Sequence, residues 1–146
     1  MLALDLGTTT GWACLDADGE IHSGVWKLQP TRFDSPGTRY SNLCRKLTEA
    51  HARFSFGQVY YEAIMFSGTT IATQVWGGLM AHLMTWCDER GVEYTGVPVG
   101  KIKKFWTGKG NANKTAMMLE CERRGFVPID DNHADALALL HMSMEG

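Results

Sequence analysis

The sequence predicts a single α/β domain, because apolar segments and amphipathic segments follow one another along 146 residues with no linker between them. Three strand-like segments joined by short turns come first, and helix and strand alternate after them. The hydrophobic content of 45% is sufficient for one real core in a chain of this length. We therefore treat residues 1–146 as one domain.

The first three strands are expected to be antiparallel neighbours. Residues 2–6 are apolar except for Asp5 and form the first strand. We place a tight turn at residues 7–11, because glycine stands at both ends of that segment. Strands are then expected over residues 12–15 and 21–28, since the Asp-Gly pair between them is a strong hairpin signal.

The rest of the chain is predicted to alternate helix and strand and to end in helices. Apolar residues recur at helical spacing after residue 37, at Tyr40, Leu43, Cys44, Leu47 and Ala50. The elements expected after this helix are a strand over 56–62, a helix over 70–90, a strand over 92–97, and helices over 99–106, 114–124 and 131–144. Gly91 and Gly125 are suited to end two of these helices.

Composition limits the possible partners and compartment. Lys and Arg number 14 against 16 Asp and Glu, so a nucleic-acid surface would have to be local. The four cysteines lack the spacing of a zinc site and are expected to be reduced thiols. No apolar run approaches the roughly 18 residues of a membrane span, and the first strand directly follows Met1. We expect a cytoplasmic protein with no membrane partner.

Two acids stand where strands should be apolar. Asp5 interrupts the first strand, and Glu62 ends the strand over residues 56–62. A buried carboxylate without a cation is unfavourable, so we expect both acids to serve one site. The alternative for Asp5 is that it caps the turn at Gly7.

A third acidic group opens the last helix. Asp131 and Asp135 lie four residues apart and share one helix face. Asp130 or Asp131 could equally cap the helix, whereas Asp135 stands among positions expected to pack on the sheet. Mg²⁺ prefers carboxylate oxygens, and a pair of such ions can promote phosphodiester cleavage. The sequence therefore predicts a metal centre formed by Asp5, Glu62, Asp131 and Asp135.

These motifs resemble those of the RuvC-like Holliday-junction resolvases, particularly the short versions carried by bacteriophages. The resemblance spans nearly the whole chain and rests on residues 2–7, 10–13, 60–62, 107–114 and 134–138. It implies an RNase H-like fold, with a mixed five-stranded sheet flanked by helices. It further implies a homodimer that binds four-way DNA junctions and makes paired nicks with Mg²⁺ or Mn²⁺, in the host cytoplasm if the chain is phage-encoded.

The family's first-strand, fourth-strand and closing acids fall on Asp5, Glu62 and Asp135. The first acidic position of the family's closing D-x-x-D-A pattern, however, falls on Asn132. The fourth metal ligand is therefore open, with Asp131 as a substitute and His133 or Asn132 as possible contributors.

A basic segment lies close to the acids in sequence and contains Lys101, Lys103, Lys104, Lys109 and Lys114. It could be an ordinary solvated surface, but beside a metal centre it is expected to attract DNA phosphates. The resemblance places Lys103 and Lys114 near the scissile phosphate, and Lys114 is a candidate catalytic residue. Met65 and Phe66 occupy the region of the family's base-stacking aromatic residue. Met65 holds the aligned position, Phe66 is the better stacking partner, and core packing is the alternative for both.

Other functions remain open. Asn132 is compatible with a junction-binding module that does not cleave, and residues 5–11 also resemble the phosphate-binding hairpin of actin and sugar kinases. Those kinases need two lobes, and this chain has room for one. A nuclease of the same fold that acts on RNA–DNA hybrids or flaps is a further alternative. Trp76, Met80 and Met84 are expected to be exposed and to supply a dimer face.

Overall fold

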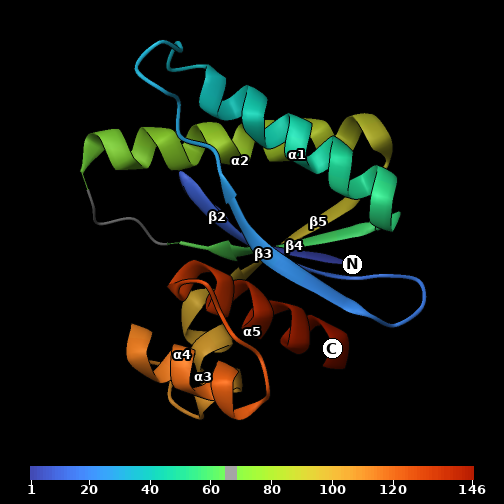
Figure 1. Cartoon of the computed structure of the whole chain (residues 1–146), viewed down its shortest axis with the longest axis vertical. Coiled ribbons are helices and arrows are strands. Elements are labelled where there is room, and N and C mark those ends of the chain that lie inside the picture. The colour runs from blue at the N-terminus through green and yellow to red at the C-terminus, as the bar shows by residue number, and fades with distance from the viewer. Residues whose placement is uncertain (65–68) are drawn as a thin grey trace.

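The computed structural model describes residues 1–64 and 69–146, and a five-stranded sheet forms its middle layer (Figure 1). The strands are β1 (Leu2–Asp5), β2 (Thr9–Leu15), β3 (Ile21–Lys27), β4 (Gln58–Ala63) and β5 (Glu93–Pro98). Their order in the sheet is β3-β2-β1-β4-β5. The first three strands are antiparallel, and β4 is parallel to both β1 and β5. This is the mixed sheet of an RNase H-like α/β fold, so the predicted fold class is confirmed.

Helices cover both faces of the sheet (Figure 1). They are α1 (Thr38–Phe54), α2 (Thr70–Arg90), α3 (Val99–Thr107), α4 (Lys114–Arg123) and α5 (Asp131–Glu145). The first two pack on one face and the last three on the other. Side chains of Thr69, Asn113 and Asp130 cap α2, α4 and α5, each accepting a hydrogen bond from a backbone N–H in the first turn.

The central strand β1 is buried on both faces. Its side chains alternate, so Leu2 and Leu4 enter the core beneath α1 and α2, whereas Ala3 enters the core beneath α5. The same alternation turns Asp5 toward α5, where it is almost completely buried. The strand thus places a carboxylate in an apolar interior.

Gly11 lies inside β2, which corrects the predicted turn over residues 7–11. The actual turn is shorter and is closed by the buried Thr10 hydroxyl, which donates to the Gly7 carbonyl at 2.7 Å. Gly11 is needed for close packing: a Cβ atom there would lie 1.9 Å from the backbone oxygen of Asn132. The absence of a side chain at Gly11 lets the start of α5 approach the sheet.

The predicted exposure of Met80 on α2 is wrong, whereas the dimer face itself stays a prediction. Met80 is buried in the core, and Trp76 and Met84 pack partly against the same core. None of the helices in the described ranges combines the length and apolarity needed to cross a membrane.

Candidate metal centre and nucleic-acid interface

Three carboxylates from distant parts of the chain converge on the α5 face of the sheet. Asp5 ends β1, Glu62 lies near the end of its parallel neighbour β4, and Asp135 begins the second turn of α5. One oxygen from each carboxylate lies within 4.8 Å of the other two. We call these three residues the carboxylate cluster.

The electrostatics of the carboxylate cluster indicate that its negative charge is only partly compensated. Burial, followed by the charges of Glu62 and Asp135, raises the pKa of Asp5 well above its ordinary range. Burial also raises the pKa of Glu62, against the opposing effects of a hydrogen bond with Asp5 and the charge of Lys103. The pKa of Asp135 rises to about 7, chiefly through burial and then through Glu62 and Asp131. Three carboxylates that favour protonation, one buried and two partly buried, are a donor set suited to a hard divalent cation.

Asp131 lies beside the carboxylate cluster. It is in the first turn of α5, and its negative charge contributes to the raised pKa values of Asp5, Glu62 and Asp135. Its carboxylate is 3.4 Å from the ammonium group of Lys114. Its role as the fourth ligand stays a prediction.

His133 is committed to structural hydrogen bonds, which corrects its proposed part in metal binding. Its Nδ1 accepts from the backbone N–H of Ile129 at 2.9 Å, so Nε2 carries the proton and donates to the Ser23 hydroxyl at 2.8 Å. Burial lowers the pKa of His133, consistent with a neutral ring. Neither ring nitrogen is left for a metal ion. The backbone of Asn132 packs against Gly11.

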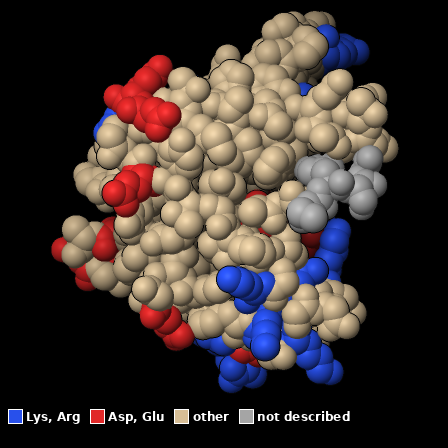
Figure 2. All heavy atoms as spheres, turned by 180° about the vertical axis from the view of Figure 1, so that it is seen from behind, with Lys and Arg blue, Asp and Glu red and all other residues tan. Residues whose placement is uncertain are grey.

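The five lysines of the basic segment divide into two groups. Lys103 and Lys114 act on the carboxylate cluster, since the charge of each opposes the rise in the pKa of Asp135. Lys101, Lys104 and Lys109 are exposed. From behind, Lys and Arg atoms gather over the lower part of the molecule, which contains α3, α4 and α5 (Figures 1 and 2). The local basic surface expected from the sequence therefore borders the acids, whereas Met65 and Phe66 lie outside the described residues.

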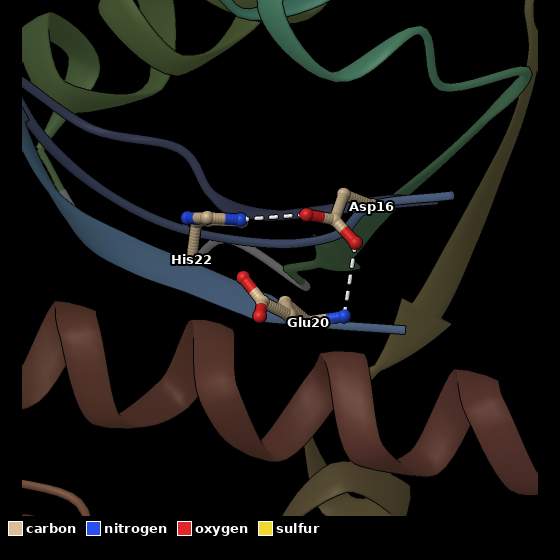
Figure 3. A group of neighbouring side chains, drawn as sticks. All are labelled: Asp16, Glu20 and His22. Carbon is tan, nitrogen blue, oxygen red and sulfur yellow. Dashed lines mark hydrogen bonds and ion pairs between the residues drawn. The ribbon is translucent and has the colours of Figure 1, made fainter. Parts of the chain in front are cut away.

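A second group of potential metal ligands was not anticipated from the sequence and lies at the β2–β3 hairpin (Figure 3). It consists of Asp16, Glu20 and His22. One Asp16 oxygen accepts from the backbone N–H groups of Asp18 and Glu20, both at 2.9 Å, and the other lies 2.8 Å from His22 Nε2. Each oxygen of Asp16 thus already has a protein partner that shapes the turn.

We predict that Asp16→Ala lowers the melting temperature by a few degrees, because three hydrogen bonds that hold the hairpin are lost. The pKa of Asp16 is lowered, first by its hydrogen bond with His22 and then by the Glu20 N–H. Its contribution is therefore present above the ordinary Asp pKa and is lost as acid protonates the folded protein. Thermal melts at pH 3 to 7 test this, with the exposed Asp18→Ala as control; identical melting of wild type and Asp16→Ala at pH 7 would refute it.

Searches against protein-family models and curated proteins give no match. Solved structures do match. Thermus thermophilus RuvC, also solved in complex with a Holliday junction substrate, is 20% identical over 99% of this chain and 97% of its own, with a TM-score of 0.74. The yeast mitochondrial Holliday junction resolvase is 15% identical over 94% and 74% of the two chains, with a TM-score of 0.62. The fowlpox virus resolvase, solved with Holliday junction DNA, is 12% identical over 99% and 97%, with a TM-score of 0.57. This chain shares the fold of Holliday-junction resolvases.

Proposed function

We propose that this chain is a metal-dependent, structure-selective endodeoxyribonuclease that resolves four-way or other branched DNA junctions, acting as a homodimer that makes paired nicks. The observation that carries the proposal is the convergence of Asp5, Glu62 and Asp135 in a fold that Holliday-junction resolvases share. We place its action in the cytoplasm, that of the host if the chain is phage-encoded.

Each residue of the site has a part in this activity. The carboxylate cluster would hold Mg²⁺ or Mn²⁺, as two ions with Asp131 as the fourth ligand. When bound, such ions supply an activated water and stabilise the leaving oxygen. Lys103, half-buried beside the carboxylates, offsets their charge and attracts the phosphate. Lys114 is exposed and can exchange its pairing with Asp131 for a DNA phosphate, while the outer lysines contact the backbone on either side.

Asp131 and Asn132 can be separated by substitution. We predict that Asp131→Asn lowers the junction-cleavage rate by about tenfold or more, and that Asn132→Ala has a smaller effect. Because Asp131 also pairs with Lys114, the same change is made in a Lys114→Gln background. If Asp131 is a metal ligand, Asp131→Asn should lower the cleavage rate further in the Lys114→Gln background. Equal or reversed effects of the two single variants would reject Asp131 as the fourth ligand.

The function itself is tested by incubating the protein with labelled four-way junction, linear duplex, flap and RNA–DNA hybrid in Mg²⁺, Mn²⁺ or EDTA. The proposal predicts symmetric nicks in the junction that require metal and disappear in Asp5→Asn. Preferential cutting of flap or hybrid would assign another substrate to the same centre. Junction binding without cleavage in either metal would favour a non-cleaving module, and ATP hydrolysis with intact DNA would favour the kinase-like alternative.

A further inference from the structure

We propose that the open edge of β3 docks an extended, acidic peptide segment of another protein, which adds to the sheet as a sixth strand. This surface is separate from the carboxylate cluster and is independent of the proposed nuclease activity. β3 is the end strand of the sheet and lies at the front of Figure 1.

The free edge of β3 carries unpaired backbone groups. Leu28 N–H donates to the Thr8 carbonyl and Asp16 N–H to the Glu20 carbonyl, so the even-numbered residues of β3 are those that hydrogen-bond to β2. The residues whose N–H and C=O groups point away from β2 are Ile21, Ser23, Val25 and Lys27. Within residues 1–64 and 69–146, no hydrogen bond joins these outward backbone groups to another segment. Such an edge is a template for another strand.

A cavity of about 480 Å³ lies along this edge and has an apolar wall on each side. Trp26 and Phe54 contribute to the wall on the α1 side, and Trp12 stacks on Trp26 within it. On the other side Ile129 is 67% exposed, beside Val25. Side chains of an added strand alternate between the two faces of the sheet, so they would fill both walls.

The charges around the cavity favour an acidic peptide as the partner. Lys46 and Glu49, the single acid among the described lining residues, form an ion pair at 3.7 Å. Arg53 on the cavity wall and the exposed Lys27 at the end of β3 have no acidic partner within the described residues. This excess of cations favours a peptide with acidic residues. A second copy of β3 fits less well, because residues 21–27 contain no acid. Nucleic acid has no amide groups in register with the open backbone.

The test uses two short labelled peptides with the same valine and phenylalanine positions, one with aspartate and one with lysine at the remaining positions. Fluorescence anisotropy measures binding, and hydrogen exchange measures protection of the Ser23 and Val25 amides. We expect the acidic peptide to bind the wild-type protein and to protect both amides. Val25→Pro should weaken binding about tenfold or more; because the Val25 N–H points outward, the ladder to β2 stays intact.

The double change Lys46→Glu and Arg53→Glu should switch the preference to the basic peptide, whereas Arg32→Glu, an exposed cation outside the cavity, should leave it unchanged. Melting curves verify that each variant is folded. Asp5→Asn serves as a second control, since a change in the carboxylate cluster should leave peptide binding unaltered. Absence of binding, or binding indifferent to Val25→Pro and to the charge reversal, would overturn the proposal. Protection of the same amides by self-association or by junction DNA alone would show that the occupant is wrong.

Discussion

Asp135→Asn will stabilise the metal-free protein while abolishing the DNA cleavage that we propose for it. In the folded state the pKa of Asp135 is about 7, against an ordinary value of 3.8, because the carboxylate is buried beside Glu62 and Asp131. Holding this group ionised therefore opposes folding by up to about 4 kcal/mol. Asparagine removes that charge and fills the same space, but it also removes a proposed metal ligand. We expect cleavage to fall at least about 100-fold, since loss of even an outer partner of a metal ligand costs about 10- to 100-fold.

The pH dependence of this stabilisation has a defined sign. The unfolded chain loses the Asp135 proton near pH 4, whereas the folded protein retains it until about pH 7. Wild type therefore loses stability relative to Asp135→Asn as the pH rises from about 4 to 7, and the difference becomes constant above that. Urea unfolding in EDTA across this range measures it, with the exposed Asp18→Asn as the matched control. A stability difference that does not grow with pH would show that Asp135 is not held in an unfavourable charged state.

Gly11→Ala will destabilise the protein by about 2 to 3 kcal/mol and lower the cleavage rate of the molecules that remain folded. The new Cβ would lie 1.9 Å from the Asn132 backbone oxygen, so α5 must move away from the sheet. That movement would also displace Asp135, which is on the same helix.

Gly57→Ala provides the control for Gly11→Ala, because nothing lies within 4 Å of a Cβ atom built there and Gly57 is exposed. Urea unfolding of the two variants should differ by most of the predicted 2 to 3 kcal/mol. Similar stability would mean that α5 can shift on the sheet with little loss of packing.

The fold was predictable because its signals are local. Apart from the start of β2, alternating or continuous apolar segments, the Asp-Gly hairpin and the helix-ending glycines correctly located the five strands and five helices of the described residues. The error at residues 7–11 has a physical cause, since glycine permits both a tight turn and close packing. Sequence alone does not distinguish these uses, because the clash partner of Gly11 is more than one hundred residues away, at Asn132.

The carboxylate cluster was predictable in part, because an acid in an apolar strand signals an unusual environment. The structure brings Asp5, Glu62 and Asp135 together as expected. It excludes His133 as a metal ligand, because the ring hydrogen-bonds to Ser23. That contact depends on how α5 crosses β3. The acid and histidine spacing around the Asp-Gly turn was a usable signal for the Asp16 group, because antiparallel pairing brings the two ends of a hairpin together.

The central claim, that the carboxylate cluster is a metal centre, is tested most directly by anomalous diffraction from crystals soaked in Mn²⁺. We predict anomalous density bounded by Asp5, Glu62 and Asp135, and none there in crystals of Asp5→Asn. Mn²⁺ bound by Asp16, Glu20 and His22 while the carboxylate cluster stays empty would contradict the claim.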